Sequence, residues 1–169
     1  MVPDIFALHM VCAAPWARDC ANAQSPDRLT VPVTTAANGS KIMSVSLSMP
    51  ILVVEDHTAT ALILRALLTR LGFSDVDQTT DGMAAVAKMR EKKYALVISD
   101  WNMEPLSGYG LLKKIRLDEA LAKTRFIMIT SDSKAANVTA AEKAGVSGYI
   151  VKPFSAAALK AAIEEAFTK

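Results

Sequence analysis

The chain has 169 residues, a formal net charge of +2 and a hydrophobic fraction of 51%. This length suits one domain of ordinary size, and the hydrophobic fraction is ample for its core. The small net charge argues against a nucleic-acid-binding footprint and against an acidic tail, and no run approaches the roughly 18 apolar residues that span a bilayer.

Residues 1–48 differ in composition from the rest of the chain, and we expect them to form a poorly ordered extension. They mix Pro, Asn, Ser, Thr and Ala without a sustained period, and they hold both cysteines, Cys12 and Cys20. An apolar run followed by ANA resembles a secretory signal, but no Lys or Arg precedes it. We favour an upstream extension that is not natively translated, with translation starting at Met43 or Met49. The cysteine-free remainder then suits a reducing cytoplasm.

From Met49 onward the sequence alternates between strand and helix patterns. The first apolar run, PILVVE, is continuous and ends in an acid, which is typical of a buried parallel strand. The expected strands cover residues 50–55, 76–80, 95–99, 125–130 and 147–151, and the expected helices cover 57–72, 82–93, 109–121, 134–145 and 155–169. This alternation predicts an α/β fold, a doubly wound five-stranded parallel sheet with helices on both faces.

The first expected helix carries apolar residues that we assign to the core. Leu62, Ala66 and Leu67 share one helical face, and Gly72 provides a stop signal after it. We therefore predict that this face packs against the sheet.

Polar residues stand where the expected strands end. Glu55 and Asp56 end the first strand, Asp100 follows the third, Thr130 ends the fourth and Lys152 follows the fifth. Because these strands are parallel, their carboxyl ends meet at one edge of the sheet, where ligands bind in open α/β folds. The sequence therefore predicts a functional site at this edge.

The residue types at this edge indicate phosphoryl-transfer chemistry. Neighbouring carboxylates repel unless a cation intervenes, and Mg²⁺ takes oxygen ligands and phosphate oxygens. Lys152 offers a positive charge and Thr130 a hydroxyl group to phosphoryl oxygens. Since a carboxylate is also a covalent acceptor of phosphate, the set predicts Mg²⁺-assisted phosphoryl transfer to an aspartate.

Each of these residues also has a plainer interpretation. Asp100 is an ordinary turn residue after a strand, and Glu55 with Asp56 suits the positive end of a helix dipole. Thr130 can cap the helix that follows it, and Lys152 can be solvated. Four strand ends that carry compatible chemistry favour the functional interpretation.

The motifs VVEDH, VISDWNM, MITSD and GYIVKPF stand in the order and spacing of response-regulator receiver domains. Residues 49–169 therefore resemble a stand-alone, CheY-like receiver domain. The resemblance implies a flavodoxin-like sheet of order 2-1-3-4-5, with Asp100 as the phosphoacceptor. It also implies Mg²⁺ bound by Glu55 (mainly through water), Asp56, Asp100 and the backbone carbonyl of Asn102.

The same resemblance implies a conformational switch. Lys152 would contact the phosphoryl group, and its peptide bond to Pro153 would be cis. Thr130 would move toward the phosphoryl group, and Tyr149 would swing into the space that it leaves. A local change of charge would thus bias a two-state element and reshape a distant surface.

The sequence departs from the family pattern in two places. The acidic pair is Glu55–Asp56 where two aspartates are common, and the longer arm of Glu55 changes the metal geometry. Glu104 stands where Pro is commonest, with Pro105 one place later, and it adds a negative charge beside the site. Neither departure removes a required chemical group.

Two further residues flank the expected site. His57 follows the acidic pair, and with His9 as the other histidine no zinc constellation is present; we expect an exposed residue that opens the first helix. Trp101 is expected as a surface ring whose fluorescence reports phosphorylation.

By resemblance, the chain is a single-domain response regulator of a chemotaxis-type two-component phosphorelay. It would accept its phosphoryl group from a histidine kinase or a histidine phosphotransfer protein and signal by binding a protein target. The flagellar motor switch is the nearest specific target, and a phosphate sink or relay intermediate are rivals within the same chemistry. We expect a cytoplasmic monomer or weak dimer that binds no nucleic acid and does not insert into membranes.

Two functions of other classes remain to be weighed. An aspartyl-phosphate hydrolase needs a second acid two residues after the nucleophile, where this chain has Asn102. A flavin-binding domain needs a phosphate loop rich in Ser, Thr and Gly after the first strand, where EDHTATA offers repelling acids. We expect no enzyme activity beyond the chain's own phosphotransfer and dephosphorylation.

Overall fold

The computed structural model describes residues 45–132 and 134–168 of the chain. The predicted extension lies outside the described residues except for 45–48, so its disorder and its boundary before Met49 stay predictions. Residues 45–48 contact the domain, since the Leu47 carbonyl accepts a hydrogen bond from the Ser74 amide at 3.1 Å and Val45 packs against the core.

The described chain forms one five-stranded parallel sheet of order β2-β1-β3-β4-β5, which confirms the predicted topology. The strands are β1 (Ile51–Val54), β2 (Val76–Thr79), β3 (Leu96–Asp100), β4 (Arg125–Thr130) and β5 (Gly148–Val151). The helices are α1 (Thr58–Arg70), α2 (Gly82–Glu91), α3 (Gly108–Leu117), α4 (Ala135–Lys143) and α5 (Ala156–Thr168). Within the described ranges, no helix has both the length and the apolarity that crossing a bilayer requires.

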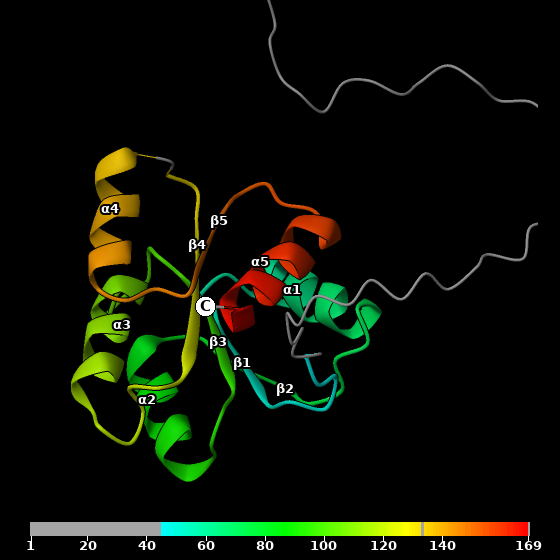
Figure 1. Cartoon of the computed structure of the whole chain (residues 1–169), viewed down its shortest axis with the longest axis horizontal. Coiled ribbons are helices and arrows are strands. Elements are labelled where there is room, and N and C mark those ends of the chain that lie inside the picture. Colours follow the sequence, from blue (N-terminus) through cyan, green and yellow to red (C-terminus); the bar gives the residue numbers. More distant parts are fainter. Residues whose placement is uncertain (1–44, 133, 169) are drawn as a thin grey trace, which may run out of the picture. The chain divides into compact units, whose positions relative to one another are not determined.

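Helices cover both faces of the sheet, with α1 and α5 on one side and α2, α3 and α4 on the other (Figure 1). The strands alternate between the two layers: Ile51 and Val53 belong to the core under α1 and α5, whereas Leu52 and Val54 belong to the opposite core. Because both faces are covered, a central strand is apolar at every position. This explains why the sequence runs of β1 and β3 show no alternation.

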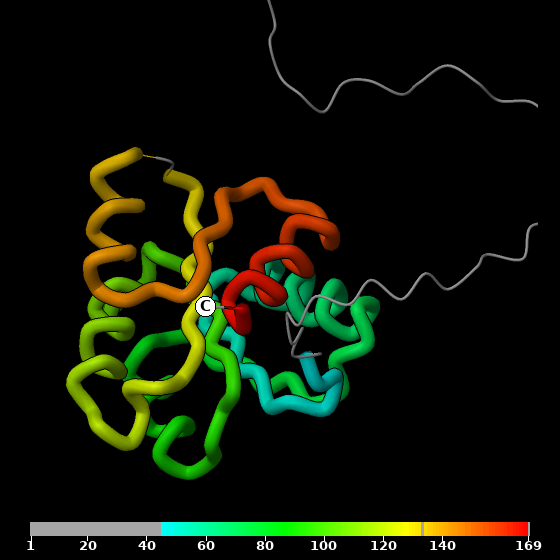
Figure 2. Tube along the Cα trace, viewed as in Figure 1, coloured from blue at the N-terminus to red at the C-terminus, as the bar shows by residue number. Residues whose placement is uncertain are grey.

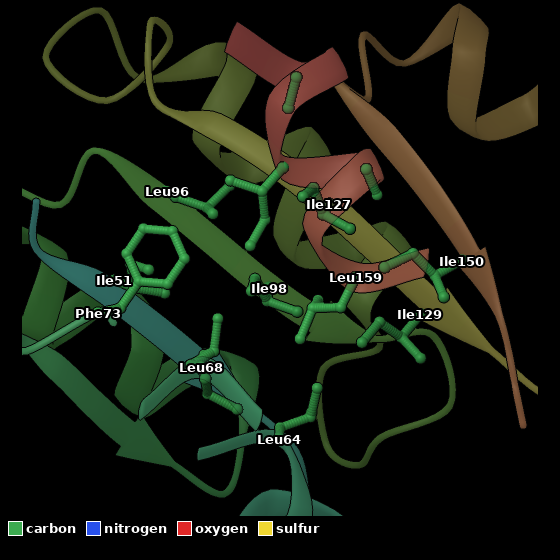
Figure 3. Packing of buried hydrophobic residues seen from close by; sticks show 14 of the residues in the cluster. Ile51, Leu64, Leu68, Phe73, Leu96, Ile98, Ile127, Ile129, Ile150 and Leu159 are labelled. Carbon is green, nitrogen blue, oxygen red and sulfur yellow. The ribbon is translucent and has the colours of Figure 1, made fainter. Parts of the chain in front are cut away.

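The core on the α1–α5 side joins segments from the two ends of the domain. Figure 2 shows α5, at the end of the chain, beside α1, and Figure 3 shows Leu64 and Leu68 of α1 and Leu159 of α5 gathered over the sheet. Side chains of this kind each contribute about 1.5–3 kcal/mol on full burial. This packing fixes β1 relative to β5, and four of the predicted site residues lie in or directly after these two strands.

The predicted core face of α1 is wrong. Leu64 and Leu68 are the buried residues, whereas Leu62 is 58% exposed, Ala66 is exposed and Leu67 is only partly buried. The helix has apolar residues around most of its circumference, so more than one helical stripe fits its sequence, and packing against the sheet selects the i, i+4 pair at 64 and 68.

Helix α3 begins directly against the tip of β3. The Gly108 amide donates to the Trp101 carbonyl at 3.0 Å, and the Ser107 hydroxyl caps the helix by accepting from the Gly110 amide at 3.2 Å. A Cβ atom on Gly108 would overlap the backbone carbonyl oxygen of Asp100. The approach of α3 to the end of β3 therefore depends on glycine at this position.

We predict that Gly108→Ala destabilises the domain by about 1–3 kcal/mol, because its new methyl group must displace backbone. Gly110→Ala is the matched control, since its Cβ would meet only the flexible end of the Leu106 side chain and alanine favours the helix. Urea unfolding of both variants tests this. Equal stabilities for the two variants would contradict the tight approach of α3 to β3.

Candidate functional site

The carboxyl ends of four strands bring the predicted polar residues to one edge of the sheet. Neighbouring strands are in close register there, with Val54 paired to Ser99 and Asp100 paired to Ile129. Parallel strands in this register end at similar positions along the strand direction. The residues that end or directly follow these strands therefore share one edge: Glu55, Asp56, Asp100, Thr130 and Lys152.

The Lys152 ammonium lies between two buried carboxylates. Its Nζ atom is 2.9 Å from Glu55 Oε2 and 2.6 Å from Asp100 Oδ1, while the two acids are only 1% and 6% exposed. Two buried acids this close would repel without the ammonium. One cation thus ties the end of β5 to the ends of β1 and β3.

The pKa values of Glu55 and Lys152 reflect a competition between burial and the ion pairs that these residues form. Burial raises the pKa of Glu55, the hydrogen bond from Lys152 opposes this rise, and the charge of Asp100 reinforces it. Burial by itself would lower the pKa of Lys152, but hydrogen bonds to Asp100 and Glu55 outweigh burial and leave that pKa raised. Lys152 is therefore charged at neutral pH.

The Asp100 carboxylate is held at both oxygens. While Oδ1 accepts a hydrogen bond from Lys152, Oδ2 accepts one from the backbone amide of Asn102 at 2.7 Å. Trp101 lies between Asp100 and Asn102 in the chain. Its backbone amide donates a hydrogen bond to the Ile129 carbonyl at 2.8 Å, and this bond continues the β3–β4 pairing past the strand end. The side chain is thus fixed at the mouth of the site by a lysine and by its own loop.

An open hollow of about 320 Å³ adjoins this loop. It is lined by Asp56, Asn102, Met103, Glu104 and Ser107. Asp56 is the accessible member of the acidic pair, with a side chain 34% exposed, whereas the Glu55 side chain is fully buried. The acid that the resemblance makes a direct metal ligand is therefore the one that solvent reaches.

The donor set at this edge fits a divalent cation. Carboxylate oxygens of Glu55, Asp56 and Asp100 are the hard ligands that Mg²⁺ takes, together with carbonyl oxygen such as that of Asn102. The ligand atoms of Glu55, Asp56 and His57 lie within 4.8 Å of one another. The predicted oxygen donors are present, and the structure adds a ring nitrogen that the sequence analysis did not place among them.

His57 is exposed and opens α1, as predicted, but its ring turns toward the acids. Its Nδ1 atom is 2.8 Å from Asp56 Oδ1 and 3.7 Å from Glu55 Oε1, while its side chain is 78% exposed. The hydrogen bond with Asp56 raises the pKa of His57. The adjacency of the three residues in the sequence was the signal that could have found this cluster.

The two predicted switch residues hold the same loop after β4. The buried Thr130 hydroxyl accepts from the Asp132 amide at 3.0 Å, and the Tyr149 hydroxyl donates to the Asp132 carbonyl at 3.0 Å. Burial raises the pKa of Tyr149, and a hydrogen bond with Thr130 partly opposes this rise. Thr130 and Tyr149 are thus coupled through the backbone of Asp132, whose part was not predicted.

Two further features of the loops bear on the predictions. Trp101, expected as a surface ring, is instead partly buried and packs against the core, and it stacks on Tyr109 with ring centroids 5.4 Å apart. The peptide bond between Lys152 and Pro153 is cis, as predicted, and the bond between Glu104 and Pro105 is also cis.

Comparison with known families gives one extensive match. The model of the response regulator receiver domain matches residues 51–164. The chemotaxis protein CheY-3 of Vibrio cholerae is 39% identical over 122 residues, which cover 72% of this chain and 94% of the relative. The chemotaxis protein CheY of Pseudomonas aeruginosa is 36% identical over 121 residues, 72% of this chain and 98% of the relative.

Solved structures agree on the fold. The chemotaxis response regulator CheY4 of Vibrio cholerae has a TM-score of 0.66 at 24% identity and covers 70% of this chain and 98% of its own. A receiver domain of a sensor histidine kinase from Pseudomonas aeruginosa PAO1, solved with a magnesium ion coordinated in its active-site cleft, has a TM-score of 0.64 at 27% identity. That match covers 72% of this chain and 98% of the other.

We predict that Lys152→Met destabilises the domain by about 2–3 kcal/mol at pH 7, because it leaves two buried acids without their cation. The substitution also removes the hydrogen bond that holds down the pKa of Glu55, so that pKa rises further. A raised carboxyl pKa destabilises the fold above that pKa, and this cost disappears as the pH falls through the ordinary value of 4.5. The destabilisation therefore shrinks between pH 7 and pH 4.

The matched control for this prediction is Lys160→Met. Lys160 is an exposed lysine of α5 whose Nζ atom lies 3.8 Å from Glu164 Oε1. Such surface ion pairs contribute little to the stability of the fold. Urea unfolding at both pH values measures the difference between the variants. Equal losses for Lys152→Met and Lys160→Met, or a loss at Lys152 that does not change with pH, would contradict the ion-pair account.

Proposed function

The chain belongs to the response regulator receiver domain family, and we propose that it is a single-domain response regulator that accepts a phosphoryl group on Asp100. The observation that carries this proposal is the fixed, buried Asp100 carboxylate at the end of β3, held between the Lys152 ammonium and the Asn102 amide. The acidic pair of Glu55 and Asp56 follows the neighbouring strand, β1. This is an arrangement suited to transfer onto a carboxylate.

In the proposed reaction the donor is a phosphohistidine of a histidine kinase or a histidine phosphotransfer protein. A carboxylate oxygen of Asp100 forms the new bond to phosphorus, and the phosphorus–nitrogen bond breaks with its electron pair going to the donor imidazole. Lys152 is placed to stabilise negative charge on the phosphoryl oxygens, since its Nζ atom is already 2.6 Å from Asp100 Oδ1.

Asp56, Asp100 and the Asn102 carbonyl would hold a Mg²⁺ ion directly, with Glu55 acting mainly through water. The ion would supply positive charge to the transferring oxygens. The protein's part is to keep these oxygen donors at one edge and to favour the ionised form of Glu55 through its contact with Lys152, at 2.9 Å.

The signal would leave the site through the loop after β4. The Thr130 hydroxyl would donate to a phosphoryl oxygen on Asp100, and its movement toward that group would draw it away from the Asp132 amide and loosen a loop that Tyr149 also holds. Both residues therefore bias the same backbone segment. Such a bistable contact is what a local charge change needs to reach a distant surface.

The proposed output is phosphorylation-dependent binding of a protein target. The relatives named as chemotaxis proteins make a flagellar motor switch the nearest specific target. A phosphate sink or relay intermediate would use the same acceptor chemistry, and it differs by binding no target when phosphorylated. We propose a cytoplasmic monomer or weak dimer for this role.

We do not propose turnover of small substrates. A hydrolase of this chemistry needs a proton donor two residues after its nucleophile. Asn102 occupies that position, and its backbone amide donates a hydrogen bond to Asp100. The activity proposed for the chain is limited to its own phosphorylation and dephosphorylation.

We predict that acetyl phosphate with Mg²⁺ adds one phosphoryl group to the wild-type chain and none to Asp100→Asn, as measured by intact-protein mass. Glu104→Gln serves as the control, because Glu104 is an exposed acid of the same loop and has no part in accepting the group. An equal addition to Asp100→Asn would remove Asp100 from its proposed role. A loss of the addition in Glu104→Gln as well would show that disturbance of the loop is enough to abolish it.

A further inference from the structure

The ring of His57 has a position that capping of α1 does not explain. His57 occupies the N-cap position, yet its side chain makes no capping hydrogen bond to the helix. Its Nδ1 atom instead faces the two acids, at 2.8 Å from Asp56 and 3.7 Å from Glu55. The nitrogen atom that can bind a metal therefore points into the acidic pair.

The spacing of these atoms fits ligands of a single ion. In octahedral coordination with bonds of roughly 2.1 Å, adjacent ligand atoms are about 3.0 Å apart and opposite ones about 4.2 Å. The distance of 2.8 Å between His57 Nδ1 and Asp56 Oδ1 is close to the adjacent spacing, so these two atoms can occupy neighbouring positions around one ion with little rearrangement. Glu55 Oε1 lies farther from Nδ1, at 3.7 Å, in keeping with its proposed role through water.

The exposure of the ring allows this role. In its hydrogen bond with the Asp56 carboxylate, which can only accept, Nδ1 carries the ring proton, so an ion that binds Nδ1 must replace this proton. The His57 side chain is 78% exposed, so Nε2 can carry the ring proton in contact with solvent while Nδ1 offers its lone pair to the ion. A hydrogen bond or solvent contact at one ring nitrogen sets which nitrogen binds a metal.

We propose that His57 is a ligand of the divalent ion at this edge, and that its nitrogen gives the site a preference for Mn²⁺ over Mg²⁺. This inference rests on the metal site of the proposed function. Mn²⁺ shares with Mg²⁺ a preference for carboxylate, carbonyl and water oxygens, but as a first-row transition ion it accepts an imidazole nitrogen more readily than Mg²⁺, which strongly favours oxygen. Carboxylates alone accept either ion, so the histidine nitrogen is the feature that makes the site selective.

The test uses the full chain with Mn²⁺, because this ion reports its own ligands. The electron paramagnetic resonance signal of free Mn²⁺ gives the dissociation constant, competition gives that of Mg²⁺, and pulsed measurements detect a nitrogen nucleus bound directly to Mn²⁺. We expect a nitrogen signal in the wild type that is lost in His57→Ala. We also expect His57→Ala to weaken Mn²⁺ binding by about 10-fold or more, against a change of less than about 3-fold for Mg²⁺.

His9→Ala is the matched control, since His9 is the other histidine of the chain, and it should keep both the nitrogen signal and the Mn²⁺ affinity. Wild-type binding of Mn²⁺ without a nitrogen signal, or equal losses for both ions in His57→Ala, would overturn the role of His57 and leave the oxygen site standing. Binding of neither ion to the wild type would instead contradict the metal site itself.

Discussion

The site depends on one ammonium group between two buried carboxylates. Lys152 follows β5, Glu55 follows β1 and Asp100 ends β3, so the contacts at 2.9 Å and 2.6 Å join three strands at one edge of the sheet. Leaving either acid buried without a cation would be costly. The same contact orients the Asp100 carboxylate, which a phosphoryl acceptor needs. Stability and the proposed chemistry therefore rest on the same lysine.

The fold makes this contact possible by covering both faces of the sheet and leaving its carboxyl edge open. Apolar residues at every position of β1 hold the strand between two helical layers, and Gly108 lets α3 approach the tip of β3. The charged groups that line the site then lie at the strand ends. In the proposed function, a phosphoryl group on Asp100 would attract Lys152 and the Thr130 hydroxyl. Movement of Thr130 would change its contact with the loop at Asp132.

The apolar runs were sufficient to predict a five-stranded parallel sheet and the edge at which the polar residues gather, whereas the strand order followed from the resemblance to receiver domains. The sequence analysis failed for the core face of α1, where Leu62 was chosen although Leu64 and Leu68 are buried. The apolar residues of α1 lie around most of its circumference, so more than one face fits the sequence. The sequence analysis also missed two side-chain partners: it did not use the adjacency of Glu55, Asp56 and His57 to expect the His57–Asp56 contact, and the link from Tyr149 to the Asp132 carbonyl leaves no pattern in the sequence. The assigned roles of the site residues remain predictions.

The central claim is that Asp100, and no other acid at this edge, carries the phosphoryl group. Borohydride reduction of the phosphorylated protein converts an aspartyl phosphate into homoserine, and peptide mass spectrometry then locates the modified position. The account predicts homoserine at position 100 alone. Homoserine at position 56 or 132, or at no position in a protein that has taken up phosphate, would contradict it.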